Sequence, residues 1–284
     1  MWIIYAFASA FFAGITAILS KIGINNINSN LATAIRTVVV LIFSWIIVFI
    51  VGSQTELAQI EARTVVFLIL SGAATGASWL CYFKALQLGD VNKVAPIDKS
   101  STILSMLLAF IFLNEKISFL KIICIIMIGT GTYMMIERKE ASGTNGSGWL
   151  IWAVLSAFFA ALTSILGKIG ISEIDSNLGT AIRTIVVLIM SWLVVFAEKN
   201  RIEFKSISKK NMFYLIVSGI ATGLSWLAYY KALQEGPASI VVPIDKLSIL
   251  VTIFFSCVIL KERMTKKSLC GLILLTAGTL LLLV

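Results

Sequence analysis

The stretch that decides the fold is "TGLSWLAYYKALQEGPASIVVPIDKLSIL", residues 222–250, which is strongly apolar yet carries Lys231, Asp245 and Lys246. A near copy, "TGASWLCYFKALQLGDVNKVAPIDKSSTIL", occupies residues 75–104. Charged side chains inside a membrane are costly, and the positions that keep them are usually functional. The chain therefore places the same charges in the same apolar setting twice, and the rest of the sequence explains why.

Composition places the whole chain in a membrane. Its 284 residues are 59% hydrophobic and 13% charged, with a mean hydropathy of +0.99, whereas soluble domains carry about 25% charged residues. The formal net charge of +9 falls mostly in loops, where it sets membrane orientation, and no nucleic-acid motif accompanies it. The chain has no histidine, the usual metal ligand and general base. We expect no metal, no cofactor, no nucleic-acid partner and no enzymatic activity.

The two halves of the chain are copies at a constant spacing. Trp79 matches Trp226, and the motif PIDK at 96–99 matches PIDK at 243–246. A polar segment with several glycines separates the copies, as expected of a linker. The predicted organisation is a first repeat, a linker and a second repeat, at residues 1–137, 138–148 and 149–284.

Each repeat contains five apolar runs of about the 20 residues that a membrane span needs. None alternates apolar with polar residues as a membrane strand does. The runs lie at 2–20, 31–51, 65–88, 94–113, 119–136, 149–167, 178–197, 212–234, 240–260 and 268–284. Because five is odd, the second repeat enters the membrane upside down relative to the first. We predict an all-α integral membrane fold of ten transmembrane helices in two inverted five-helix repeats, which transporters use to form two similar states.

Equivalent loops of the two repeats differ in basic residues. The loop at 52–64 contains one, Arg63, whereas its counterpart at 198–211 contains five. The loop after the fourth helix contains Lys116 and Lys121, and its counterpart in the second repeat contains four. Short loops rich in Lys and Arg face the cytoplasm. We therefore expect both termini of the chain to lie outside.

Two matching sets of charges are candidates for gating or coupling. They are Arg36, Asp98 and Lys99, and Arg183, Asp245 and Lys246. Inversion of the repeats predicts one set near each membrane face. A proline two residues before each aspartate predicts a position in the first turn of a helix, near its positive end. An ionised aspartate there needs a partner, so we hypothesise that each pairs with an Arg or Lys of its own set. Each pair would close one face, and a proton, ion or substrate would compete for it.

Polar faces at helical spacing predict a central cavity. Each aspartate begins a hydroxyl stripe with spacings of three and four residues, and the third helix of each repeat adds hydroxyls and aromatic rings suited to a small molecule. The predicted lining is Thr75, Ser78, Trp79, Tyr82, Ser101, Ser105, Thr222, Ser225, Trp226, Tyr229, Ser248 and Thr252. The alternatives are hydroxyls bonded to the carbonyl four residues earlier and aromatic rings that pack between helices or at the interface.

Two further features predict structural roles. Glycines four residues apart, at Gly72 and Gly76 and again at Gly219 and Gly223, indicate close helix contacts. Glu115 and its match at position 262 lie beside basic residues at helix ends, and we expect solvated loop charges there.

The motifs SGxATGxSWL, YxKALQxG and PIDK, present in each half, resemble those of the drug/metabolite transporter superfamily, EamA type. The chain resembles two of the small five-helix bacterial and archaeal members fused together. This resemblance implies an alternating-access transporter of small metabolites in a prokaryotic inner membrane, in a family whose members often export and are often proton-coupled. It also implies that the first four helices of each repeat enclose the cavity. The fifth helices would be peripheral and support contacts in a homodimer.

The balance of intramembrane charge bears on the substrate. The candidate positions carry more cations than carboxylates, which favours an anionic or zwitterionic substrate such as an amino acid or organic acid. A rival interpretation is efflux of hydrophobic or quaternary cations, which would bind to the aromatic rings. A rival of another class is a non-transporting membrane sensor or assembly subunit, which needs no solvated pathway.

Overall fold

The computed structural model describes residues 1–23, 27–88, 94, 97–135, 148–197, 207–259 and 265–284. Within these residues the regular structure is helical and no strand occurs, which confirms the predicted all-α fold. The predicted linker, apart from Gly148, lies outside the described residues, as do position 262 and part of each loop with the most basic residues.

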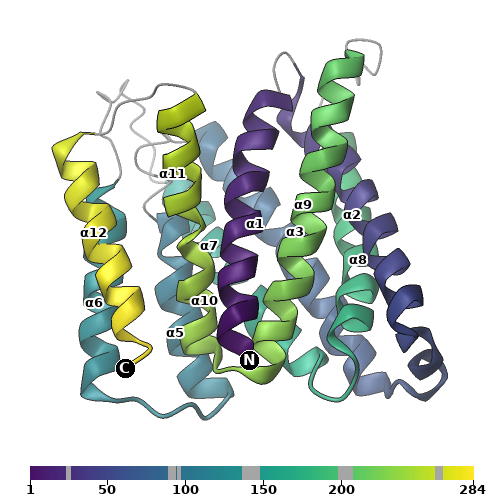
Figure 1. Ribbon diagram of the computed structural model, residues 1–284, viewed down its shortest axis with the longest axis horizontal. Helices are drawn as coiled ribbons and strands as arrows, with labels where there is room; N and C mark the ends of the chain where they lie inside the picture. The colour runs from purple at the N-terminus through teal and green to yellow at the C-terminus, as the bar shows by residue number, and fades with distance from the viewer. Residues whose placement is uncertain (24–26, 89–93, 95–96, 136–147, 198–206, 260–264) are drawn as a thin grey trace.

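The helices of the two halves follow the same order (Figure 1). The first half contains α1 (Trp2–Gly23), α2 (Ser29–Val51), the short 3-10 helix η1 (Ser53–Gln59), α3 (Ala62–Leu88), α5 (Ser101–Phe112) and α6 (Phe119–Met134). The second contains α7 (Gly148–Gly170), α8 (Ser176–Ala197), α9 (Lys209–Glu235), α10 (Ala238–Lys246), α11 (Ser248–Ile259) and α12 (Lys266–Leu281). In the part of the chain that the structure describes, seven spans are long and apolar enough to cross a membrane, α10 and α11 together forming one of them, and α6 is a shorter apolar helix.

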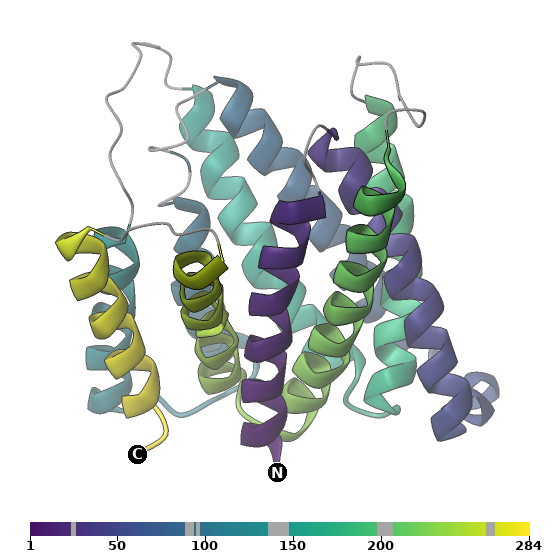
Figure 2. The same ribbon diagram turned by 45° about the horizontal axis from the view of Figure 1, so that its top comes forward.

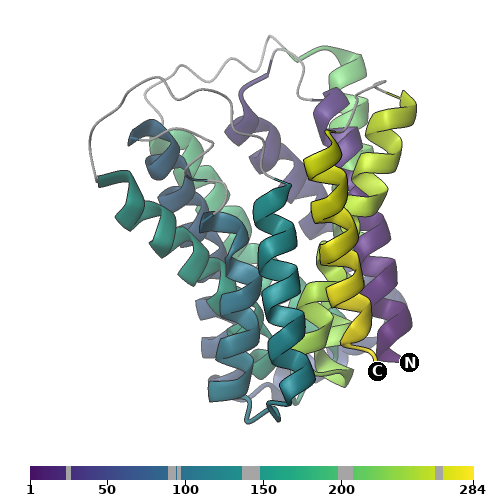
Figure 3. The ribbon, with the colours of Figure 1, turned by 90° about the vertical axis from the view of Figure 1, so that its left-hand side faces the viewer.

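The second repeat is inverted relative to the first. In Figure 1, α1 begins at the lower end of the bundle, where both chain termini lie, and Figure 3 shows α7 beginning at the opposite end. We call the end where α7 and α9 finish the lower end, and the end where α1 and α3 finish the upper end. Helix contacts exchange between the repeats: α1 packs on α9 as α7 packs on α3, and α1 packs on α11 as α7 packs on α5. Such exchange is expected of two copies related by a two-fold axis.

Glycines allow the central helices to approach closely, as predicted. A Cβ at Gly72 would lie 2.7 Å from Cβ of Val186 and 2.9 Å from the carbonyl oxygen of Arg183 on α8. The matching Gly219 faces α2 in the same way, with Cβ of Val39 at 2.7 Å. The α3–α8 and α2–α9 contacts are therefore two copies of one glycine-dependent crossing.

The fourth helix of each repeat is interrupted at its charged motif. The Ser100 amide donates to the carbonyl of Ile97 at 3.1 Å, and the equivalent Leu247 amide donates to Ile244 at 2.9 Å. These tight turns separate α10 from α11 and precede α5. Discontinuous helices of this kind form binding sites near the middle of the membrane in transporters.

The predicted position of Asp245 in the first turn of a helix is wrong. α10 already begins at Ala238, so Pro243 lies inside it and Asp245 lies near its C-terminal end. Proline suits a first turn but is also tolerated where a helix is about to break, and the interruption at Leu247 follows closely. Asp245 therefore gains nothing from a helix N-terminus, and its carboxylate depends on side-chain partners.

The fifth helices form a peripheral pair. α6 and α12 lie side by side at one edge of the bundle (Figure 2). They cross so closely that a Cβ at Gly131 would lie 2.7 Å from the carbonyl oxygen of Gly271. The faces of α6 and α12 that meet are therefore buried between these two helices, and any homodimer contact would involve their outer faces.

The glycine crossings predict a stability effect. Gly72→Ala should lower the free energy of unfolding by about 1–3 kcal/mol, because the new methyl group overlaps α8. Gly148→Ala is the matched control, because a Cβ there meets nothing within 4 Å. Thermal unfolding of the detergent-solubilised protein measures both, and equal melting temperatures would contradict the crossing.

Candidate functional site

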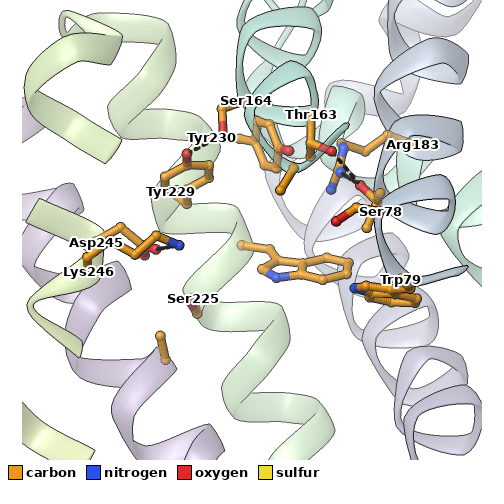
Figure 4. A pocket seen from close by; sticks show the side chains of 14 residues that line it. Ser78, Trp79, Thr163, Ser164, Arg183, Ser225, Tyr229, Tyr230, Asp245 and Lys246 are labelled. Atoms are coloured by element: carbon orange, nitrogen blue, oxygen red, sulfur yellow. Dashed lines mark hydrogen bonds and ion pairs between the residues drawn. The ribbon is translucent and has the colours of Figure 1, made fainter. Parts of the chain in front are cut away.

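A polar cavity of about 280 Å³ lies among α1, α3, α7, α8, α9 and α10. Figure 4 shows Asp245 and Lys246 on one side of the cavity, and Arg183, Ser78 and Trp79 on the other. The lining residues are Ala13, Thr75, Ser78, Trp79, Ala160, Thr163, Ser164, Arg183, Ser225, Trp226, Tyr229, Tyr230, Asp245 and Lys246. The cavity therefore presents both signs of charge, hydroxyl groups and aromatic rings to one small volume.

Not every predicted residue lies in this lining. The structure places Arg36, Tyr82, Asp98, Lys99, Ser101, Ser105, Thr222, Ser248 and Thr252 outside it. Three of these hydroxyls bond within their own helix: Ser105 donates to the Ser101 carbonyl at 2.9 Å, Thr252 to that of Ser248 at 3.0 Å, and Thr222 to that of Ser218 at 2.8 Å. That is the alternative arrangement of the predicted stripes, in which each hydroxyl bonds to the carbonyl four residues earlier.

The sequence interpretation missed the contribution of α7. Thr163 and Ser164 line the cavity, and Ser164 lies 2.8 Å from the hydroxyl of Tyr229. Thr163 has a match in Thr16, and Ser156 has a match in Ser9. Because Ser156 and Thr163 are seven residues apart, or about two turns, they share a helix face. That repeated polar face was the signal that would have added α7 to the site.

The side chain of Arg183 is held by hydrogen bonds and by aromatic rings. Its side chain is 2% exposed; Nε donates to Ser71 at 3.3 Å and a terminal nitrogen donates to Thr75 at 2.8 Å. The guanidinium lies over the ring of Tyr230, at 4.5 Å from its centroid, and over Trp226 at 5.4 Å. Hydrogen bonds and cation–π contacts together hold the charge at the cavity wall.

Space for the Tyr230 ring comes from Gly167. A Cβ at that glycine would lie 2.5 Å from the ring. The matching positions in the first repeat are Ser20 and Phe83. There the Ser20 hydroxyl lies 2.8 Å from Ser218 and accepts a hydrogen bond from Arg36. The two arginines therefore have different surroundings, although the repeats are otherwise closely matched.

Asp245 is bound by the other repeat. Ser9 on α1 donates to its Oδ1 at 2.6 Å, and the Ser9 hydroxyl lies 3.3 Å from that of Ser225. The same triad recurs in the first repeat, where Ser156 on α7 donates to Asp98 at 3.0 Å and lies 3.4 Å from Ser78. Each half-buried carboxylate therefore accepts a hydrogen bond from a serine of the opposite half of the chain.

One of the hypothesised ion pairs is present among the described residues. Asp245 lies 3.9 Å from Nζ of Lys246, within its own set. Among the described residues neither arginine pairs with an aspartate, since Arg36 and Arg183 donate to hydroxyl groups instead. The arginine–aspartate alternative of the hypothesis is therefore not seen among the described residues, and the position of one set near each membrane face stays a prediction.

The lower end is held by side chains that bind backbone groups. Gln234 on α9 donates through Nε2 to the carbonyls of Ile171 and Ile174, at 2.6 and 2.7 Å. Glu115 accepts from the amides of Ala238 and Ser239, at 2.6 and 3.1 Å, and so caps α10, whose N-cap residue provides no side-chain bond. The expectation that Glu115 is a solvated loop charge is wrong, because the start of α10 offers it two unpaired donors.

A second, smaller cavity lies nearer the upper end, among α2, α3 and α8. Its volume is about 140 Å³. The lining consists of Asn30, Thr33, Arg36, Trp79, Phe83, Ser191 and Val194. Trp79 lines both cavities and therefore stands between them.

An inverted pair of five-helix repeats around a polar cavity is the architecture of secondary transporters. The chain belongs to the EamA-like transporter family, whose model matches residues 1–137 and 147–284. This match confirms the resemblance that the motifs suggested, and it makes the protein a multi-pass membrane transporter.

The similar proteins agree with this assignment. An uncharacterized transporter of a Sinorhizobium species is 43% identical over 134 residues, which are 47% of this chain and 95% of that protein. An uncharacterized protein of Methanocaldococcus jannaschii is 29% identical over 47% of this chain and 94% of its own length. Each of these two relatives therefore corresponds, over nearly its whole length, to about half of this chain. An uncharacterized transporter of Bacillus subtilis is 26% identical over 85% of this chain and 76% of its own.

A solved crystal structure has the same fold. It superposes with a TM-score of 0.81 and covers 98% of this chain and 94% of its own. Sequence identity is 13%, so the likeness concerns the fold alone.

The serine–aspartate contact predicts a loss of stability. Ser9→Ala should lower the free energy of unfolding by about 1.5–3 kcal/mol, the value of a hydrogen bond to a charged group. Ser9→Thr keeps the hydroxyl group and should retain most of that stability. Thermal unfolding at neutral pH measures both variants, and an alanine variant as stable as the parent would show that the carboxylate does not depend on Ser9.

Proposed function

We propose that the protein is an alternating-access secondary transporter that exports a small carboxylate-bearing metabolite, such as an amino acid or organic acid. The observation that carries this proposal is that two chemically matched ends of the molecule are packed differently. A transporter with inverted repeats interconverts two states by exchanging the conformations of its halves. Residues at matched positions of the two repeats can therefore be compared between the two ends of the molecule.

The matched glutamines illustrate the difference. Gln234 is half-buried and bonded to two carbonyls at the lower end, whereas its match Gln87, near the upper end, is exposed. In both repeats a lysine three residues earlier donates to the amide oxygen, at 3.4 Å for Lys231 and 3.5 Å for Lys84. Because this lysine occupies the side-chain oxygen of the glutamine, the side-chain nitrogen is the group that can donate to backbone carbonyls. Within the described residues, one copy of the motif binds carbonyls and the other does not.

Helix packing supports the same proposal. α7 and α9 meet near the lower end, and among the fully described helices α1 and α3 make no contact of similar extent. Leu233 on α9 is fully buried, and its match Leu86 is only half-buried. Among the described residues, the helices are accordingly packed more closely at the lower end than at the upper end.

The charges of the central cavity favour the substrate class. Lys246 lies opposite Arg183, and Asp245 is the one carboxylate in the lining. A carboxylate substrate would interact with two cations, and an amino group, if present, would lie near Asp245. Competition by a substrate or a proton for the Asp245–Lys246 pair would couple binding to the change of state.

Orientation follows from the basic residues at the upper end. Lys209 and Lys210 begin α9 and Lys266 begins α12, both at that end. The positive-inside rule assigns the upper end to the cytoplasm of a prokaryotic inner membrane. Both termini would then lie outside, and the state shown would receive substrate from the cytoplasm, as an exporter requires.

Transport by purified protein in liposomes tests the proposal. Small amino and organic acids should be taken up or exchanged, quaternary amines should not, and Arg183→Gln should reduce the rate by about tenfold or more, because a buried charge-assisted contact is lost. Glu173→Gln, at an exposed loop position, is the control. Preferential uptake of amines would favour the cation-efflux alternative, and absence of any flux would favour a non-transporting subunit.

The glutamine motif predicts opposite effects at its two copies. A cysteine at Ala160, in the central cavity, reports access from each side once the four native cysteines are replaced by serine. Gln234→Ala should raise labelling from the lower side by roughly tenfold, since two hydrogen bonds that close this end are lost. Gln87→Ala should reduce it, and Glu235→Gln should leave it unchanged. Shifts in the same direction for both glutamines would contradict alternating use.

A further inference from the structure

The smaller cavity near the upper end contains an arginine with spare hydrogen-bonding capacity. A guanidinium group has five N–H donors, and the hydrogen bond that the structure gives Arg36 within the described residues goes to Ser20. Its match Arg183 uses two hydroxyl groups and stacks on the rings of Trp226 and Tyr230. In the first repeat the cavity itself lies among Arg36 and the matching aromatic residues. The same residue types therefore form a closed cluster in one repeat and a cavity in the other.

A buried acceptor lines the same cavity. Asn30 is 6% exposed, and its Oδ1 accepts no hydrogen bond from any described residue. A buried polar atom without a partner is unfavourable, and it marks a place where a ligand or water can donate. Because Asn30 and Arg36 are six residues apart on α2, about 9 Å along the axis, an extended arginine side chain and a small solute span the distance between them.

The two groups select for one chemistry. A carboxylate satisfies the N–H groups of Arg36, preferably with two parallel hydrogen bonds. Asn30 Oδ1 is an acceptor and would oppose a bare anion, so the ligand must also bring a donor. An amino or hydroxyl group next to the carboxylate meets this requirement.

We propose that Asn30 and Arg36 form a second, shallower substrate site, specific for a small carboxylate with a neighbouring amino or hydroxyl group. Trp79 separates it from the central cavity, so a solute entering from the upper end occupies two positions in succession. This inference deepens the proposed function, on which it rests for the identity of the solute as cargo. The binding event itself is measurable without transport.

Cysteine protection tests the site directly. Val194→Cys, in the background without native cysteines, places a thiol on the lining of the smaller cavity, and Ala160→Cys does the same in the central cavity. The probes are propionate, lactate and alanine, which share a three-carbon skeleton. At Val194→Cys, lactate and alanine should slow alkylation at concentrations about fivefold lower than propionate, the worth of one net hydrogen bond.

Variants of Asn30 and Arg36 test whether these two residues cause the preference for lactate and alanine over propionate. Asn30→Ala should abolish it, and Asn30→Asp should preserve it for alanine, because the acceptor remains. Arg36→Gln should weaken all three acids by about tenfold. Asn177→Ala, the matching position in the second repeat, is the control and should leave the preference unchanged.

The outcomes separate this inference from the proposed function. Equal protection by propionate and alanine, an unchanged preference in Asn30→Ala, or protection at Ala160→Cys alone would overturn the second site. If acids are transported in liposomes but do not protect Val194→Cys, only the second site is wrong. If they protect Val194→Cys but no solute crosses the membrane, the site stands and the transport proposal fails.

Discussion

A carboxylate enclosed by membrane helices must be given hydrogen-bond donors, and in this protein the donor comes from the opposite half of the chain. Ser9 serves Asp245 and Ser156 serves Asp98. The contacts join the first helix of one repeat to the interrupted fourth helix of the other. Each repeat is therefore incomplete alone, and the central cavity exists only where the two halves meet. The twin charged motifs of the sequence are two copies of one joint between repeats.

Matched polar groups inside the bundle have different partners in the two repeats. Arg183 is satisfied by hydroxyls and rings, whereas Arg36 borders a cavity. Gln234 binds two carbonyls, and Gln87 does not have the same burial. If the protein alternates between two states as proposed, moving from one to the other would exchange partners between the repeats instead of leaving charges unpaired, which would keep the two states close in free energy.

Sequence reasoning recovered the features that depend on period and repetition: the helices, the inversion, the glycine crossings and the charged motifs. It failed where the answer depends on which backbone group a side chain binds or on where a helix begins. Helical spacing showed that Ser105 and Thr252 share a face with the aspartates, but it could not show that each hydroxyl turns to its own helix. Pro243 suggested a helix start because an interior proline and a first-turn proline look alike in sequence. The partners of Glu115 are backbone amides, which no side-chain pattern reveals.

The pair Gly167 and Tyr230, with Ser20 and Phe83 as its counterpart, has a consequence for how such molecules diversify. Two identical halves would make inward and outward forms equal in energy, because swapping the halves converts one into the other. Fusion into a single polypeptide removes this degeneracy, since a change in one half affects one form only. The room that Gly167 gives to the Tyr230 ring exists at one end alone. In a fused chain, a single substitution can therefore change the relative free energy of the inward and outward forms.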